Sequence, residues 1–457
     1  MTNRALVILG LLCAVTVGAW LALRSPSSAP GGARTTAPLF AVDEIPLERV
    51  DRVEVRPRDA TVTVFVRTAS GWEQVEPFAH PADPASVREV IDVAAALTSS
   101  RAVDPASIDP AARTALGLDP PACVLRLAWP GGERSIELGR RTVAGRAWAR
   151  VSGRAEAASV DASLHALAVE GDPRQWRLRR LHEPGGADIA RIEVRYGAAP
   201  GQRLVLQRAA GKWSLLEPVA SRADADAVRG YLEALARAEA DAFAADRPDD
   251  LAAFGLSQPE RGVVLGRAGA APGDAPAGQV DVGIPVAEGA PERFARVGGR
   301  PVVVQLGPKA LAAMFPPPAF FVDPRGSDAV PADVRGIRWT PAEGPGSAGA
   351  FALERSLDAW TADAGGVRVA ADGERVRRLL AQLCEARAPA VAFQRMPEAL
   401  VLGAYALLAA DGSALARIRV AHEPGGQWAL DGGEGVLRVF PAGFDVATDA
   451  AAYTGMR

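Results

Sequence analysis

One unit of sequence occurs three times along this chain, and this repetition constrains the fold more than any other feature. The copies are spaced by roughly 140 residues, which is the size of a domain and too long for a solenoid repeat. Residues 41–181 form the first copy, residues 182–326 the second, and residues 327–457 a degenerate third copy. The sequence therefore predicts similar domains in series.

Each copy opens with alternating apolar residues that lead to a tryptophan. In the first copy, residues 53–55 and 62–66 alternate and are followed by Gly71-Trp72. The second copy reaches Gly211-Lys212-Trp213 in the same way, and the alternating residues of the third copy lead to Trp360. Alternation of apolar and polar residues is typical of strands, and a glycine before the tryptophan indicates a turn. A β-hairpin is therefore predicted at the start of every copy.

A helix is predicted after each hairpin. An aspartate stands four residues before a valine in all three copies, and apolar residues recur at helical spacing from that valine onward. The aspartates are Asp83, Asp224 and Asp372. An aspartate side chain accepts hydrogen bonds from the free N–H groups of a first helical turn. Helix capping therefore explains the three aligned carboxylates without any catalytic role.

The end of the unit reads as an antiparallel meander. A variable loop leads to Leu116-Gly117-Leu118 in the first copy and Phe254-Gly255-Leu256 in the second, and the third copy lacks this element. Alternating strands then follow in all three copies. The predicted fold class is α+β, in which each unit is an antiparallel sheet with one packed helix.

The N-terminus carries an apolar segment without charge, Ala5 to Leu23, between Arg4 and Arg24. A helix of this length matches the hydrocarbon thickness of a bilayer, and Trp20 suits the membrane interface. Residues 1–24 are predicted to be a membrane anchor, and residues 25–40, rich in Ser, Pro, Gly and Thr, a flexible linker. A cleaved signal peptide is the alternative, although no convincing small-x-small cleavage site follows.

The anchor predicts a single-pass protein of the inner (cytoplasmic) membrane. Arg4 and Arg24 flank the apolar segment on both sides, so the positive-inside rule does not decide the orientation. A short N-terminal tail before a long C-terminal region favours a C-terminal region on the periplasmic or extracytoplasmic side.

In the order of its elements, the chain resembles the domain-of-unknown-function 4340 family. These elements are the hairpin with its Trp and Pro, the Asp-capped helix, Phe-Gly-Leu-x-x-Pro and the final meander, behind an N-terminal membrane helix. The resemblance is clear over about residues 41–326 and loose over the third copy. It implies a membrane-anchored bacterial protein of a kind often encoded beside ABC-transporter components of the gliding-motility type. It brings no catalytic residues with it.

No motif in the sequence indicates catalysis, a cofactor or a metal. The four histidines, His80, His165, His182 and His422, lack zinc-ligand spacing. His-Glu-Pro-Gly-Gly occurs at 182–186 and 422–426, but at different places in the unit, and Pro-Gly-Gly is a turn signal by itself. Phosphate-binding glycine loops and Gly-x-Ser-x-Gly are absent from the sequence. A net charge of -3 does not favour nucleic-acid binding.

Three further features allow two interpretations each. Cys123 and Cys384 fall at apolar-face positions, as buried thiols or, less simply, as a disulfide. The basic run 174–180 is a solvated strand with Trp176 and Leu178 inward, or a contact with anionic lipid. The apolar, proline-rich run 315–321 is packing between units or a polyproline contact site.

These observations predict a non-enzymatic, membrane-anchored accessory or scaffold protein of a cell-envelope complex. An association with the permease or ATPase subunits of an ABC-type transport system follows from the family resemblance alone. Two alternatives remain: a module that binds envelope polymer or lipid, and a hydrolase whose site is assembled between units.

Overall fold

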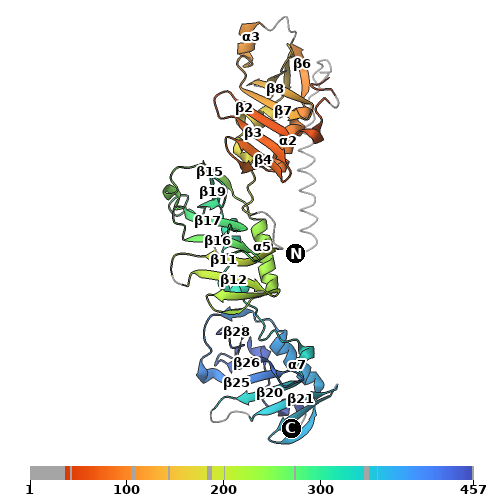
Figure 1. Cartoon of the computed structure of the whole chain (residues 1–457), viewed down its shortest axis with the longest axis vertical. Helices are drawn as coiled ribbons and strands as arrows, with labels where there is room; N and C mark the ends of the chain where they lie inside the picture. The colour runs from red at the N-terminus through yellow and green to blue at the C-terminus, as the bar shows by residue number, and fades with distance from the viewer. Residues whose placement is uncertain are drawn as a thin grey trace, which may run out of the picture. The chain divides into compact units, whose positions relative to one another are not determined.

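The computed structural model describes residues 37–41, 44–103, 109–142, 145–182, 188–199, 201–271, 274–343, 349–357 and 359–454. The chain separates into two compact units, residues 1–177 and residues 178–457. The first unit holds one antiparallel sheet and the second holds two (Figure 1). The predicted anchor, Ala5 to Leu23, lies outside the described residues. Among the helices that are described, none is long and apolar enough to cross a membrane.

The first sheet has ten strands. In spatial order they are β1 (Ala37–Pro38), β6 (Thr98–Val103), β10 (Ala157–Asp161), β9 (Arg146–Val151), β8 (Gly132–Arg141), β7 (Cys123–Trp129), β2 (Arg52–Pro57), β3 (Thr63–Thr68), β4 (Gly71–Glu76) and β5 (His80–Pro81).

The second sheet has nine strands. In spatial order they are β14 (Ser221–Arg222), β13 (Lys212–Glu217), β12 (Arg203–Ala209), β11 (Ile189–Arg195), β16 (Arg261–Arg267), β17 (Gly278–Pro285), β18 (Arg293–Val297), β19 (Val302–Leu306) and β15 (Ala242–Asp246).

The third sheet also has nine strands. In spatial order they are β23 (Val367–Ala371), β22 (Ala359–Ala364), β21 (Phe351–Ser356), β20 (Gly336–Pro341), β25 (Val401–Leu408), β26 (Ala414–His422), β27 (Trp428–Asp431), β28 (Leu437–Phe440) and β24 (Ala390–Ala392).

The three sheets share one strand order, apart from the extra β1 in the first. The opening hairpin supplies one side of each sheet, and the closing meander supplies the other. The third sheet is as complete as the second, although its sequence motifs are degenerate. The segment expected to be a variable loop instead contains a strand in each copy, β6, β15 or β24, which pairs at the far side of the sheet. The predicted antiparallel sheets are thus confirmed.

A twelve-residue helix follows the hairpin of each sheet: α2 (Pro84–Ala95), α5 (Ala225–Ala236) and α7 (Gly373–Cys384). The predicted caps are confirmed, because Asp83, Asp224 and Asp372 each accept hydrogen bonds from backbone N–H groups of the first turn. Each helix buries its apolar face, including the valine four residues after the cap, against its sheet. The valines are Val87, Val228 and Val376.

In each of the three copies, the end of the copy is hydrogen-bonded to the start of its helix. The backbone N–H of the capping aspartate donates to the carbonyl oxygen of an aromatic residue at the end of the copy. The pairs are Asp83 with Trp176 at 2.8 Å, Asp224 with Phe321 at 2.8 Å, and Asp372 with Tyr453 at 2.7 Å. All three aromatic side chains are buried. The same contact thus joins the beginning of the helix to the end of the copy in all three copies.

Shorter helices connect these elements. They are η1 (Leu47–Arg49), α3 (Pro110–Ala115), α4 (Ser163–His165), η3 (Ala166–Glu170), η4 (Pro173–Trp176), η6 (Ala252–Phe254), α6 (Pro308–Met314), η7 (Pro318–Phe321), η8 (Pro331–Asp333), η9 (Glu398–Leu400), η10 (Ala442–Phe444) and α8 (Ala451–Thr454).

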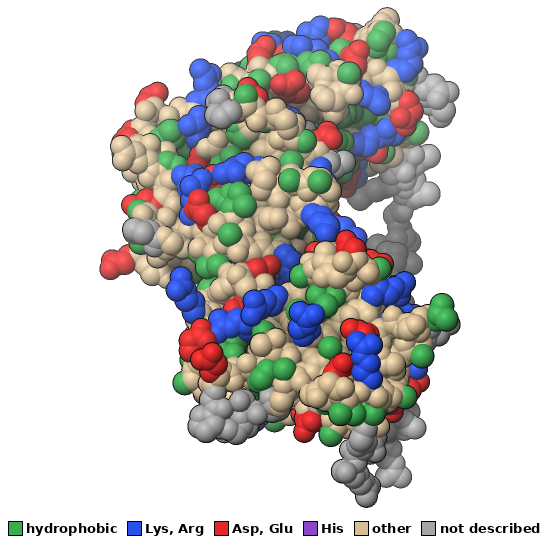
Figure 2. Space-filling model, turned by 60° about the horizontal axis from the view of Figure 1, so that its bottom comes forward, with side chains coloured by type: hydrophobic (Ala, Val, Ile, Leu, Met, Phe, Trp, Pro, Cys, Tyr) green, Lys and Arg blue, Asp and Glu red, His purple; other side chains and the backbone are tan. Residues whose placement is uncertain are grey.

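The sheet face opposite the helix carries cross-strand ion pairs, such as Arg150 with Glu137 at 2.5 Å and Arg203 with Glu193 at 2.8 Å. Basic and acidic side chains are interspersed over the surface that Figure 2 displays. Such partly exposed pairs contribute little stability, because solvent screens them. The core between helix and sheet is the main source of stability.

The glycines of the Leu-Gly-Leu and Phe-Gly-Leu motifs are required by their backbone. Gly117 has φ +70° and Gly255 has φ +67°, a left-handed conformation that favours glycine. A Cβ at Gly255 would also lie 2.8 Å from the backbone nitrogen of Ile284. The two motifs are therefore matching tight turns that lie against the second strand after them, β8 at Arg140 and β17 at Ile284.

The basic run 174–180 does not form the predicted strand. Pro173 to Trp176 form the 3₁₀ helix η4, which Asp172 caps. Proline fits the first position of such a helix, and this local signal outweighs the alternating pattern. Trp176 is buried in the first unit, and Arg177 donates to the Gln74 side chain at 2.8 Å.

The aromatic residues of run 315–321 pack within the second copy. Phe315 contacts Tyr196 edge to face, with ring centroids 6.0 Å apart. Phe321 packs in the same manner on Tyr231 of α5, at 5.0 Å. Phe320 remains half exposed. These contacts explain the apolar character of the run by packing inside the copy that it closes.

Candidate functional site: an arginine–carboxylate junction

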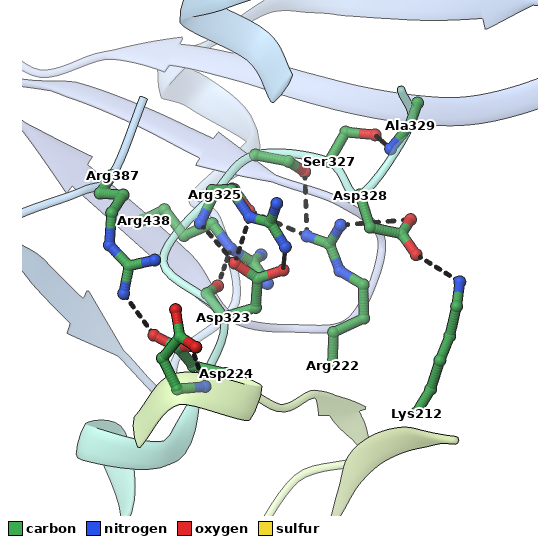
Figure 3. Close-up of polar contacts among 12 residues, drawn as sticks. Lys212, Arg222, Asp224, Asp323, Arg325, Ser327, Asp328, Ala329, Arg387 and Arg438 are labelled. Atoms are coloured by element: carbon green, nitrogen blue, oxygen red, sulfur yellow. Dashed lines mark hydrogen bonds and ion pairs between the residues drawn. The ribbon is translucent and has the colours of Figure 1, made fainter. Parts of the chain in front are cut away.

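A dense polar cluster of the second unit surrounds residues 322–329, here called the junction segment, between the second and third sheets (Figure 3). Its backbone pairs with both. Val322 bridges to Ala223 next to β14, and the carbonyl of Pro324 accepts from Ala388 N–H at 3.0 Å. A further bridge joins Arg325 to Arg387 after α7. The segment is thus held on one side by the second copy and on the other by the third.

Arg438 lies at the centre of this junction and is fully buried, with 0% of its surface exposed. It comes from β28. Its Nε donates to the carbonyl of Asp323 at 2.8 Å, and its Nη2 to Glu434 Oε2 at 2.6 Å. A buried guanidinium is costly unless it is paired and hydrogen-bonded. These two contacts supply both the counter-charge and a hydrogen bond to the junction segment.

Arg222, on β14 of the second sheet, reaches the same carboxylate. Its Nε lies 3.0 Å from Glu434 Oε1, and its Nη2 donates to the carbonyls of Arg325 and Gly326 at 2.9 and 3.2 Å. Glu434 is therefore shared by two arginines, one from each sheet. This shared carboxylate is a direct polar link between the two copies.

Further ion pairs surround this core. Asp323, 3% exposed, binds the Arg325 guanidinium through both oxygens at 2.9 Å. This hydrogen bonding raises the pKa of Arg325. Asp224, the cap of α5, also pairs with Arg387 of the third copy. One carboxylate therefore serves both the helix start and the junction.

Asp328 lies between two cations, Arg222 at 3.5 Å and Lys212 at 3.3 Å. Burial alone would raise the pKa of this carboxyl. The charge of Arg222 and the hydrogen bond from Lys212 outweigh burial, so the pKa is lowered from its usual 3.8. Asp328 is therefore ionised at neutral pH, and its contribution to the junction is electrostatic.

Close backbone approach completes the junction. A Cβ at Gly326 would lie 2.7 Å from the carbonyl oxygen of Leu383 and 2.9 Å from Leu430 Cδ1. Only glycine fits here without a shift of the surrounding chain. The junction segment is thus held by charge, by backbone hydrogen bonds and by steric fit.

The four carboxylates of the junction, those of Asp224, Asp323, Asp328 and Glu434, each pair with at least one cation. Carboxylates held in this way are suited to fixing two segments together. Groups of three or more metal-ligating side chains are not found within the described part of the chain. The sequence predicts Asp224 only as a helix cap and does not point to the other three carboxylates, because the partners across the junction are far apart along the chain.

Cys123 and Cys384 are both free and buried. Burial raises the pKa of the Cys123 thiol to about 12 and that of the Cys384 thiol, with the help of the Glu385 charge, to about 11. Both thiols therefore stay protonated at neutral pH, and a protonated thiol is a poor nucleophile. They act as small apolar side chains of the core.

The histidines occupy separate places. His165 Nε2 hydrogen-bonds to the Gly139 carbonyl at 2.8 Å, and His422 packs on the Trp428 ring at 4.7 Å. In the second His-Glu-Pro-Gly-Gly motif, Gly426 has φ +82° and its N–H donates to the Glu423 carbonyl. That copy forms the turn predicted from Pro-Gly-Gly. Residues 183–187 of the first copy lie outside the described residues.

Comparison with known families supports the internal repeat. The profile of the family described as a domain of unknown function (DUF4340) matches residues 72–219 and again residues 213–407. The matches begin at Trp72 and Trp213, which stand opposite an arginine in equivalent hairpins. A search of curated proteins gives no match. Because the two family matches cover well over half of its length, the chain belongs to the DUF4340 family.

Proposed function

We propose that the chain is a non-enzymatic, membrane-anchored accessory or scaffold protein of a cell-envelope complex. Ala5 to Leu23 would hold it in the inner membrane as a single span, with the repeated sheets on the periplasmic or extracytoplasmic side. The observation that carries the proposal is the junction around Arg222, Glu434 and Arg438. Its charges, one fully buried and two partly buried, join two copies of one fold, as a scaffold of fixed spacing requires.

The proposed partner is an ABC-type transport system, through its permease or ATPase subunits. This part rests on the family resemblance, whose implied relatives are often encoded beside such components. A repeated fold whose described residues show no evident reaction centre suits a subunit that positions other proteins. The proposal therefore separates into two claims, attachment to the membrane and attachment to a transporter.

The test is a pull-down of the tagged full-length protein from gently solubilised membranes, with mass spectrometry of the proteins that come with it. A shortened chain without residues 1–24 is treated in parallel. Transporter subunits are expected with the full-length protein, and the shortened chain tells whether the repeats or the anchor make the contact. If neither form retains a transporter component, the partner claim is wrong. Recovery of the full-length protein in the soluble fraction would contradict the anchor.

A groove beside α7 gives specific support to a second candidate, binding of an envelope polymer. It has a volume of about 600 Å³ and is lined by Arg355, Trp360, Arg377 and Leu380, among others. Arg377 pairs with Glu374 of the same helix at 2.5 Å, whereas the matching arginine of the first copy, Arg88, reaches Glu48 of η1 at 2.9 Å. Cosedimentation with isolated cell-wall polymer tests this candidate. Arg377→Ala should weaken binding, whereas Arg378→Ala on the same helix should not.

A further inference from the structure

Two positions on the helix-bearing face of the sheets differ in kind between the three copies. Strand register defines them. Leu127, Leu265 and Leu407 lie opposite Val53, Ile192 and Ile337 of the central strands. Four residues before these leucines stand Cys123, Arg261 and Gly403. The first sheet thus has a fully buried thiol and the third a glycine where the second sheet has an arginine.

The second position lies two strands away in the same register. Each residue at the first position lies opposite a residue of the next strand, which in turn lies opposite a residue of the strand after it. The intermediate residues are Leu138, Val282 and Val420, and the residues opposite them are Ala149, Ala295 and Leu430. Two residues before these stand Ala147, Arg293 and Trp428. Ala147 is 0% and Trp428 8% exposed. Both positions are therefore apolar or glycine in the first and third sheets and arginine only in the second.

Arg261 has few of the contacts that a guanidinium needs. It lies over the Phe315 ring at 4.5 Å, and its Nε is shielded from solvent without a hydrogen-bond partner. Arg293 donates one hydrogen bond, from Nη1 to the Gly283 carbonyl at 2.6 Å. Among the described residues, neither arginine has a carboxylate partner. Burial and the like charge of Arg293 lower the pKa of Arg261.

The surroundings are aromatic and neutral. Tyr196 directly follows the central strand β11 and contacts Phe315, and its hydroxyl donates to the Pro316 carbonyl at 2.5 Å. Burial raises the pKa of Tyr196, so the hydroxyl adds no charge. Asp281 is occupied with Arg195 on the opposite face of the sheet, at 2.7 Å. Two partly exposed arginines thus face a region in which the described residues supply no counter-charge.

We propose that Arg261 and Arg293 form a binding site for an oxyanion, a phosphate or carboxylate group of a small molecule. Guanidinium groups present several N–H donors in a planar fork that matches such oxygens, and the bonds are charge-assisted. A bound oxyanion would relieve the repulsion between the two arginines and supply the acceptors that they lack. The apolar residues at the matching positions of the other two sheets confine the site to the second copy.

The experiment uses the full chain in detergent and measures its thermal unfolding midpoint in sodium phosphate, sodium acetate and sodium chloride at matched ionic strength. A ligand that binds only the folded state raises the midpoint with concentration. We expect a rise in phosphate, acetate or both, relative to chloride, and the more effective anion identifies the preferred group. Calorimetric titration with that anion then gives the affinity directly.

Variants distinguish a site from a general salt effect. In Arg261→Met and Arg293→Met, the rise should be lost, while the midpoint in chloride stays equal or increases because the like-charge pair is gone. Arg296→Met, on the opposite face of β18, should keep the full rise. If Arg261→Met fails to fold, Arg261→Lys takes its place. This variant keeps the charge but lacks the planar fork of donors, so its midpoint should rise only weakly in the effective anion. An equal rise in all variants, or none in the native chain, would overturn the proposal.

Discussion

The second and third sheets share a strand order but differ at one matched position of the equivalent strands β19 and β28. β19 carries Val304, and β28 carries Arg438 in the same register. Val304 is 3% exposed and Arg438 0%, so burial does not distinguish them. What differs is the neighbourhood, because Arg438 meets the junction segment and Glu434. A buried charge here indicates where one copy is attached to the next.

The largest expected effect tests that charge. Arg438→Met should lower the free energy of unfolding of the second unit by about 3–5 kcal/mol, because a buried ion pair loses one partner. Urea denaturation followed by circular dichroism measures it. Adding Glu434→Leu should recover part of the loss, since fewer charges are then left unpaired. A double variant no more stable than the single one would show that the pair is not the source of the effect.

Steric fit at the junction gives the next effect. Gly326→Ala should cost about 1–3 kcal/mol, as expected for overpacking, since its Cβ meets the Leu383 carbonyl at 2.7 Å. Gly425→Ala is the matched control, with no heavy atom within 4 Å of the added Cβ. Urea midpoints of the two variants should therefore separate clearly. Equal midpoints would mean that the junction segment moves freely.

The caps Asp224 and Asp372 allow the same substitution to be compared in the second and third copies. Asn caps a helix as well as Asp does, so Asp372→Asn should leave stability nearly unchanged. Asp224→Asn keeps the cap but loses the charge that pairs with Arg387 across the junction, and we expect a loss of about 1 kcal/mol. Thermal unfolding of both variants checks this. Identical melting of both variants would argue against a role for Asp224 in the junction.

The smallest effect is the response to acid. The pKa of Asp328 is lowered in the folded chain, so its stabilisation is complete above the unfolded pKa of about 3.9. The contribution disappears as the pH falls through the lower folded value. Asp328→Asn should therefore reduce the difference in urea midpoint between pH 7 and pH 3. An unchanged difference would show that Asp328 contributes nothing to the junction.

Local signals allowed much of the fold to be predicted. The caps at Asp83, Asp224 and Asp372 need only a side chain and the next turn, and the hairpins need only alternation. The strands β6, β15 and β24 were missed because they pair with residues of the distant meander. The family assignment was also within reach of the sequence, because the same hairpin tryptophan recurs.

The junction could not be predicted from the same signals. Arg438 lies between Leu437 and Val439 in a four-residue strand, where alternation does not say which face is buried. Its Asp323 partner is 115 residues away along the chain. The helix start at Asp224 looks like its counterparts in sequence, and its pairing with Arg387 depends on how the copies are arranged. Local capping was thus visible, and attachment between copies was not.

The hydrogen bond between each capping aspartate and a late aromatic residue has a consequence for synthesis on the ribosome. The N-terminus of each helix is completed by a residue that follows it by roughly 80–100 positions, so closure is a non-local and late event. A copy emerging from the ribosome cannot finish folding until its Trp176, Phe321 or Tyr453 has left the exit tunnel. The copies therefore mature in order from the N-terminus, each sealed before the next is complete.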